Sequence, residues 1–253
     1  MFDTNQILGK LIRLPLKLIP PDQTIRILQG PGRGLKWIAG SYTNGCWLGS
    51  YEFEKQLLLN SGLVKTDDVI YDIGAHVGYF SIIFSKLVGE NGKVYAFEPV
   101  EENVAYIKKH VLINDLKNLE IIESGVSDKS GKLTFQNGIN NATGHISNEI
   151  KFGKTAITIT VTNLLDCIAI NKLPKPDLIK MDIEGAELEV THSIIEYVKK
   201  IKCKLLISTH SDDITHDLVS LLKRNEFNVT GHQWSGKPNI KTLANSTLIL
   251  GIP

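Results

Sequence analysis

Hydrophobic and polar residues form a repeating pattern along most of this chain. Short apolar runs predict buried strands, and longer segments with apolar residues at helical spacing predict helices between them. The predicted strands cover residues 69–73, 93–97, 119–124, 132–136, 156–161, 178–181, 204–209, 228–231 and 246–250. The predicted helices cover residues 79–87, 104–113, 186–199 and 213–224.

This alternation of apolar strands with helices predicts an α/β fold. Continuous apolar strands are typical of a mostly parallel sheet with helices on both faces. The last two strands have no helix between them, so we expect them to pair antiparallel at an edge of the sheet. Residues 132–136 and 156–161 predict a hairpin. The expected fold is a Rossmann-like, seven-stranded sheet with an N-terminal helical or loop cap.

The first 66 residues differ from the rest of the chain. They contain proline-rich stops at Pro15 and Pro20, and the glycine-rich stretch GPGRGLKWIAG, which predicts turns. We interpret residues 1–66 as a cap and substrate-side extension over the ligand site. Residues 67–253 would then form a single α/β domain, since domains of this size are common.

The segment ILGKLIRLPLKLIPP near the N-terminus is apolar enough to suggest a targeting signal. Lys10, Arg13 and Lys17 interrupt its apolar residues, and no small-residue cleavage site follows. These features argue against a signal peptide and against a transmembrane segment. A helix docked on the domain is the favoured interpretation, and weak peripheral contact with a membrane surface is the alternative.

Composition narrows the choice of partners and compartment. The formal net charge of +1 over 253 residues gives no global field for nucleic acid. The three cysteines, Cys46, Cys167 and Cys203, are isolated and form no C-x-x-C motif. They favour a reducing, cytoplasmic location without disulfides or a zinc cluster. The oligomeric state stays open.

The stretch VIYDIGAHVGYFS followed by VYAFEP contains the strongest candidate ligand site. Asp72, Gly74 and Gly78 follow one predicted strand and Glu98 ends the next, where open α/β sheets bind ligands. A dinucleotide fingerprint would have glycine where Asp72 stands, and a carboxylate there would repel a pyrophosphate. S-adenosylmethionine, with an ammonium and a sulfonium, fits better, and Glu98 would accept from its ribose hydroxyls. A plain structural turn is the alternative.

A second group of carboxylates lies in PDLIKMDIEGAELEV. Asp182 ends a predicted strand and Glu184 follows in the turn, whereas Glu187 is explained by the helix dipole. The next strand ends near His210, so Asp182, Glu184 and His210 are expected to converge beside the strand of Asp72. They would act as a general base on a hydroxyl. A divalent metal is less favoured, because it needs more oxygen ligands than the sequence offers.

The chain resembles the FkbM-like family of S-adenosylmethionine-dependent methyltransferases. The matching segments are VIYDIGAHVGYFS, FEPVEENVAYIKKHVLIN, GVSDKSGKLTF, VTNLLD and DLIKMDIEGAELEV, in that order. The resemblance extends from about Gly49 to His210. One position departs from the pattern: the family often has a glutamate two residues before the histidine of the fifth strand, and this chain has Ser208.

The resemblance implies roles for individual residues. It places the acceptor side at Asp182 and Glu184. It also implies four groups of cofactor-binding residues. The loop that holds the donor is Asp72, Gly74, Ala75, His76 and Gly78, and the ribose carboxylate is Glu98, with Pro99 and Asn103 in its turn. The adenine edge is Ser127 and Asp128, and the pair that covers the donor is Tyr51 and Glu52.

The function implied is O-methyl transfer from S-adenosylmethionine to a hydroxyl of a sugar, glycan or natural-product acceptor. Alignment of oxygen, carbon and sulfur would supply much of the acceleration. Asp182 or His210 would accept the proton and Glu184 would position the acceptor. An NAD-dependent oxidoreductase and a non-catalytic cofactor-binding module are the alternatives. The sequence does not identify the acceptor or the role of the polar loop 137–154.

Overall fold

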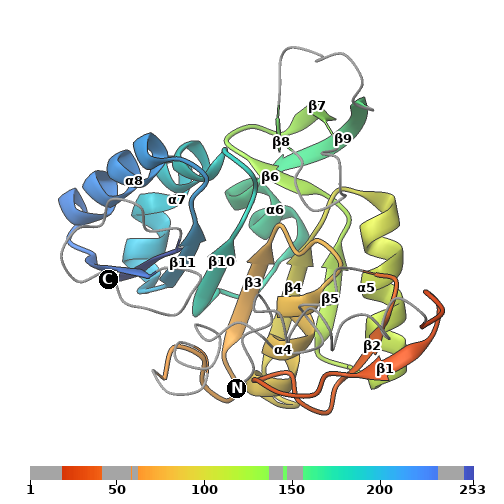
Figure 1. Cartoon of the computed structure of the whole chain (residues 1–253). Helices are drawn as coiled ribbons and strands as arrows, with labels where there is room; N and C mark the ends of the chain where they lie inside the picture. The colour runs from red at the N-terminus through yellow and green to blue at the C-terminus, as the bar shows by residue number, and fades with distance from the viewer. Residues whose placement is uncertain (1–18, 42–57, 59–61, 137–144, 147–155, 233–247) are drawn as a thin grey trace, which may run out of the picture.

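The computed structural model describes residues 19–41, 58, 62–136, 145–146, 156–232 and 248–253, and the structural statements below concern these residues. A seven-stranded sheet forms the centre of the molecule, in the order β12-β13-β11-β10-β3-β4-β5 (Figure 1). Its strands are β3 (Val69–Ile73), β4 (Lys93–Phe97), β5 (Leu119–Ile122), β10 (Leu178–Met181), β11 (Lys204–Ser208), β12 (Asn228–His232) and β13 (Leu248–Ile252).

The directions of these strands confirm the predicted α/β fold. Strands β11, β10, β3, β4 and β5 pair parallel with one another. Strand β13 pairs antiparallel with both β11 and β12, as expected for the last two strands. The register of β10 on β3 sets Lys180 opposite Asp72. The two predicted carboxylate groups therefore lie at neighbouring strand ends.

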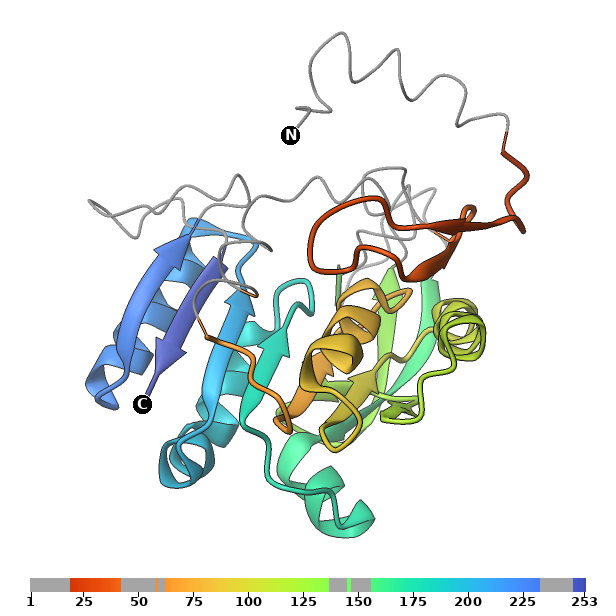
Figure 2. The same ribbon diagram turned by 90° about the horizontal axis from the view of Figure 1, so that it is seen from below.

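Helices cover both faces of this sheet (Figure 2). Helices α4 (Tyr79–Val88) and α5 (Glu101–Asn114) cover one face, and α6 (Leu164–Asn171), α7 (Glu187–Ile201) and α8 (Asp212–Arg224) cover the other. Successive side chains in a strand point to opposite faces. Ile70 accordingly packs into the core beneath α4, whereas Tyr71 and Ile73 pack into the core beneath α7.

One prediction in the middle of the chain needs correction, and a second is confirmed. The strand predicted over 119–124 ends at Ile122, where a tight turn brings the Ser124 N–H to the Ile122 carbonyl. Strand β6 (Gly125–Ser127) then enters a second sheet, ordered β6-β9-β7-β8. The predicted hairpin is confirmed as β7 (Gly131–Gln136) and β9 (Ala156–Asn163), with β8 (His145–Ile146) beside β7.

Helix α6 was not predicted, although VTNLLD contains its start signal. The Asn163 side chain caps the helix by accepting hydrogen bonds from the N–H groups of Leu165 and Asp166. The helix is only eight residues long. A helix this short gives little apolar periodicity, so the cap residue was the available signal.

The described part of the N-terminal extension, predicted as a helical or loop cap, contains a β-hairpin. Strands β1 (Thr24–Arg26) and β2 (Lys36–Ile38) pair antiparallel. Gly30 and Gly34 have positive φ angles of 75° and 88°, which explains the glycines of the connecting segment. Residues 1–18 and 42–57 lie outside the described residues, so the cap over the ligand site and the boundary at residue 66 stay predictions.

The hairpin is attached to α5 and to the turn after β3 through His110. The buried His110 ring stacks on Trp37 at 4.0 Å between centroids and accepts the Ile38 N–H at 3.1 Å through Nε2. Its Nδ1 lies 2.9 Å from the carbonyl of Val77. Burial lowers the pKa of His110 to about 4, so the ring is neutral and donates from Nδ1. The hairpin is therefore integrated with the α/β unit.

Two further sequence predictions concern cysteines and membrane spans. Both described cysteines, Cys167 and Cys203, are buried and free, whereas Cys46 lies outside the described residues. In the described parts of the chain, none of the helices is both long enough and apolar enough to cross a membrane.

Candidate active site

The turn between β3 and α4, with the end of β4, is where the sequence predicts the donor to bind, and it is called the donor side below. The N–H groups of Gly74 and Ala75 both donate to the Phe97 carbonyl, at 3.1 and 3.0 Å. Gly74 and Gly78 have φ angles of 77° and 86°. A Cβ atom on Gly74 would lie 1.9 Å from the carbonyl oxygen of Asp182. Glycine at position 74 thus lets the turn approach the backbone of the acceptor side closely.

Glu98, at the end of β4, is held by three N–H groups. Its Oε2 accepts from the His76 N–H at 2.8 Å, and its Oε1 accepts from the Val100 N–H and from Asn103 Nδ2. Burial raises the pKa of Glu98 to about 7, although the three hydrogen bonds act to lower it. A carboxylate has about four acceptor positions, so capacity for a ligand hydroxyl remains. This arrangement fits a ribose.

Asp72 has a different environment from the one expected. Its side chain is fully buried, accepts from Ser81 Oγ at 2.6 Å and lies 3.2 Å from Lys180 Nζ. The sequence predicts a carboxylate at Asp72 that faces the positive charges of the donor. The structure corrects this, because Lys180 neutralises the charge within the protein. The contacts of Asp72 instead tie β3, α4 and β10 together.

The other expected donor residues are distributed around this turn. Pro99 lies beside Gly125, where a Cβ atom would be 3.4 Å from the proline ring, so β6 passes close to the end of β4. Ser127 ends β6, and its hydroxyl donates to Asp128 at 3.1 Å. Tyr51 and Glu52 lie outside the described residues.

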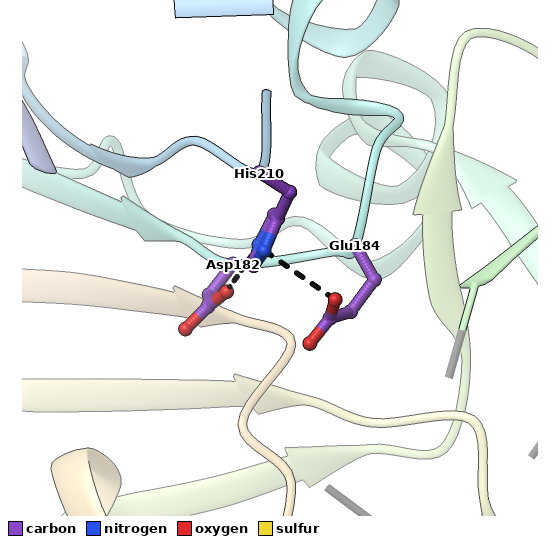
Figure 3. Close-up of side chains that lie close together, drawn as sticks. All are labelled: Asp182, Glu184 and His210. Carbon is purple, nitrogen blue, oxygen red and sulfur yellow. Dashed lines mark hydrogen bonds and ion pairs between the residues drawn. The ribbon is translucent and has the colours of Figure 1, made fainter. Parts of the chain in front are cut away.

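The acceptor side brings Asp182, Glu184 and His210 together, as expected from the sequence (Figure 3). Asp182 follows β10, Glu184 lies in the turn before α7, and His210 follows β11. His210 Nε2 lies 2.9 Å from Asp182 Oδ1, and His210 Nδ1 lies 3.4 Å from Glu184 Oε2. All three side chains are partly exposed, between 24% and 31%.

The turn from β10 to α7 is shaped by Glu187. This carboxylate is fully buried and accepts hydrogen bonds from the N–H groups of Ile183 and Gly185. It thus holds the turn that leads into α7, and its place in the first turn of the helix agrees with the helix-dipole role expected from the sequence. Glu184 has a φ of 57°, an uncommon value for a residue with a side chain. This conformation directs its carboxylate towards His210.

The charges in this cluster depend on one another. The hydrogen bond with Asp182 raises the pKa of His210 to about 9, so the ring is protonated at neutral pH. Burial acts to raise the pKa of Asp182, but Lys180 and His210 lower it below its ordinary value. Burial raises the pKa of Glu184 to about 7. Glu184 is therefore the group of the three that changes charge near neutral pH.

The same three side chains offer ligand atoms within 4.8 Å of one another, a separation that a divalent cation could bridge. A cation would have to replace the proton on His210, because a protonated ring has no lone pair. A divalent metal at these three side chains therefore stays less favoured than proton transfer by a general base.

Sequence reasoning missed Lys180 and Ser81, the two partners of Asp72. The signal for Lys180 was present, since it is a lysine within the otherwise apolar strand LIKM. A buried lysine needs an anionic partner. The parallel register with β3 identifies that partner as Asp72.

The fold, the glycine turn and the carboxylate that ends the second strand define the class of S-adenosylmethionine-dependent methyltransferases. A crystal structure of a methyltransferase FkbM from Methylobacillus flagellatus KT has this fold, with a TM-score of 0.51 and 20% identity. The similarity covers 78% of this chain and 47% of that one.

A family model, the methyltransferase FkbM domain, matches residues 72–229, so the chain belongs to the FkbM methyltransferase family. It is 26% identical over 160 residues to the hexuronic acid methyltransferase AglP of Haloferax volcanii, covering 62% of each protein. It is 25% identical over 198 residues to the methyltransferase sdnD of Sordaria araneosa, covering 66% of this chain and 76% of that protein. The chain thus spans less than two thirds of AglP. Because the chain belongs to a methyltransferase family, the alternative of an NAD-dependent oxidoreductase is set aside.

Proposed function

We propose that this protein transfers a methyl group from S-adenosylmethionine to a hydroxyl of a sugar or of a related natural product. The observation that carries this proposal is the direct contact between the two halves of the site, where the donor turn at Gly74 meets the backbone of Asp182. Reacting groups bound on the two sides would be neighbours. One relative is named a hexuronic acid methyltransferase, which supports a sugar acceptor.

On the donor side, the proposed binding residues are those that surround the turn. Glu98 accepts hydrogen bonds from ribose hydroxyls, while Gly74 and Gly78 let the backbone approach the ligand. When bound, S-adenosylmethionine supplies a methyl group activated by the positive charge on sulfur. Ser127 and Asp128 are the proposed adenine edge, and Tyr51 and Glu52 are proposed to cover the donor.

On the acceptor side, we assign the proton acceptor to Glu184. The hydroxyl oxygen takes the methyl group, and the Glu184 carboxylate takes the hydroxyl proton. This changes the division of roles expected from the sequence. Both ring nitrogens of His210 face carboxylates and the ring is protonated, so His210 has no free lone pair. Glu184 has a pKa of about 7, close to the ideal for a general base. Asp182 and His210 orient it.

The test begins with the wild-type protein and donor labelled with deuterium in its methyl group. It is incubated with a panel of neutral sugars, uronic acids and polyketide-type alcohols. We expect S-adenosylhomocysteine to accumulate with one acceptor class, and the label to be found by NMR on an oxygen. Label on nitrogen or carbon would contradict O-methylation. Donor binding without product from any acceptor would favour the non-catalytic module.

Substitutions then test the assigned roles. We expect Glu184→Gln to lower kcat by about 10²- to 10⁴-fold, the usual contribution of a general base. Asp182→Asn should also abolish most turnover while leaving donor affinity within about threefold, because the aspartate does not bind the donor. Glu189→Gln is the matched control, since Glu189 is an exposed acidic residue in the first turn of α7. Full activity in Glu184→Gln would exclude Glu184 as the base.

A further inference from the structure

Lys180 connects three segments of the candidate site. Its Nζ lies 3.2 Å from Asp72 Oδ1, 3.2 Å from the carbonyl oxygen of Gly74 and 3.9 Å from Asp182 Oδ2. The same atom lies 5.3 Å from the centre of the Phe80 ring on α4. One ammonium group therefore contacts the end of β3, the donor turn and the first acceptor-side carboxylate.

Stability alone gives no reason for a lysine at this position. The Lys180 side chain is 7% exposed, and Leu178, Ile179 and Met181 in the same strand are fully buried and apolar. Burying an ion pair costs desolvation energy that often equals or exceeds the attraction between its charges. Replacing a buried ion pair by apolar residues of similar volume is often neutral or stabilising. The pair is better explained by what the ammonium group positions.

We propose that Lys180 is a positioning residue that fixes the donor turn against the acceptor-side carboxylates and balances their charge. This inference rests on the proposed function. The ammonium group holds the Gly74 carbonyl and Asp182, so the two halves of the site keep a constant separation. It is also a second cation, besides His210, next to the acceptor-side carboxylates.

Several charged or titratable groups surround Lys180. Asp72 and Asp182 are its direct partners, and Glu98 at the end of β4 also acts on it. His76 from the donor turn and His210 act on Asp182. Lys180 is among the groups that lower the pKa of Glu184. Removing its charge should therefore leave the acceptor-side carboxylates harder to ionise.

The variants must separate positioning from folding. Lys180→Met alone would leave Asp72 buried without a cation, which is strongly destabilising. The double variant Asp72→Asn/Lys180→Met removes both charges and keeps an acceptor for Ser81. The matched control is Asp68→Asn/Lys204→Met, because Lys204 begins β11 and pairs with Asp68 at 3.6 Å, before β3 begins. The control loses a strand lysine–aspartate pair far from the strand ends that form the site.

Three measurements are made on each protein after thermal melting has shown that it is folded. NMR titration follows the His210 ring without donor or acceptor, calorimetry gives the donor Kd, and turnover is measured against pH. In the site variant we expect the His210 pKa and the acid limb of kcat to move up by about half a pH unit, because the lost Lys180 cation acts directly on Asp182 and Glu184, whereas the lost Asp72 charge is not among the groups that shift their pKa values. We expect kcat to fall about tenfold and the donor Kd to change less than about threefold, as for lost alignment.

Asp72→Asn alone provides a second test with the opposite sign. It keeps the ammonium group and removes its buried partner, so the His210 pKa should move down. If the double variant does not fold, the His210 titration of Asp72→Asn still tests the role of Lys180. The inference is overturned if His210 titrates in the site variants as it does in the Asp68→Asn/Lys204→Met control. Absence of methylated product from the wild-type protein would instead count against the proposed function, and the His210 titration would still decide the role of Lys180.

Discussion

The donor side and the acceptor side of the site use carboxylates in contrasting ways. On the donor side, Glu98 receives three N–H groups, and Asp72 receives a hydroxyl and an ammonium group. On the acceptor side, Asp182 and Glu184 are partly exposed and share one imidazole. The N–H groups around Glu98 hold its carboxylate in place, whereas a proton on His210 can be shared with Asp182 or Glu184. The comparison teaches that the same residue type can be fixed by surrounding donors on one side and share an imidazole on the other, which is why we propose ligand binding for the first and proton transfer for the second.

The largest expected effect comes from the point where the two sides meet. Gly74→Ala would place a Cβ atom 1.9 Å from the Asp182 carbonyl oxygen, in a residue with φ of 77°. Because the backbone must move, we expect a loss of about 3 kcal/mol or more in the free energy of unfolding, measured by thermal melting.

Gly62→Ala is the matched control for that substitution. Gly62 has a similar φ of 67°, but a Cβ atom there would meet nothing within 4 Å. It should cost only about 1 kcal/mol, the price of the backbone conformation alone. Equal losses in the two variants would show that the close approach of the donor and acceptor sides contributes nothing.

A smaller effect is expected at the donor-side carboxylate. Glu98→Gln keeps the shape of the side chain but removes its charge and exchanges an acceptor for a donor. Calorimetry should show donor affinity weakened by about 10- to 100-fold, the loss expected for charge-assisted hydrogen bonds. Glu101→Gln, in the exposed first turn of α5, is the control. An unchanged donor Kd in Glu98→Gln would break the assignment of the two sides.

The smallest effect concerns pH. Glu98 has a pKa raised to about 7, and its ionised form is the stronger acceptor for hydroxyls. Donor affinity should therefore increase by up to about tenfold between pH 6 and pH 8, with release of a proton on binding. Calorimetry in buffers with different ionisation enthalpies measures this proton. Binding without proton release would show that Glu98 is already ionised in the free protein.

The stability of the free protein should change in the opposite direction. The folded-state pKa values of Glu98, Glu184 and His210 are all raised, to about 7, 7 and 9. A raised pKa means that the folded state binds protons more tightly than the unfolded chain. The stability linked to Glu98 and Glu184 is therefore present below pH 4.5 and is lost as pH rises to about 7, and the stability linked to His210 is present below pH 6.5 and is lost as pH rises to about 9. Denaturant unfolding between pH 4.5 and pH 9, compared with the same scan of Glu98→Gln, checks this sign for Glu98.

The sequence was sufficient for the main sheet because its strands are continuous apolar runs separated by amphipathic helices. It was also sufficient to bring Asp182, Glu184 and His210 together, because parallel strands end at one edge of the sheet. The environment of Asp72 could not be obtained in the same way. It depends on Lys180 from a strand more than a hundred residues later, and on the register between the two strands.

The charge states of Asp182, Glu184 and His210 could not be predicted from the sequence either. Asp182 or His210 looked equally suitable as the base when only strand ends were known. The choice depends on which oxygen faces which ring nitrogen and on how deeply each group is buried. Likewise, no local pattern distinguishes the short strand β6 from an extension of β5, because the chain changes sheets within a single tight turn.

The position of β13 has a consequence for how this chain is made and shortened. Residues 248–252 insert between β11 and β12, although β12 precedes them in the sequence. During synthesis, that flank of the sheet stays open until the ribosome has released this segment. A fragment trimmed to the family-matched residues 72–229 would lack β13 and most of β12, so the edge of β11 would be unpaired, and an unpaired edge is a template for aggregation.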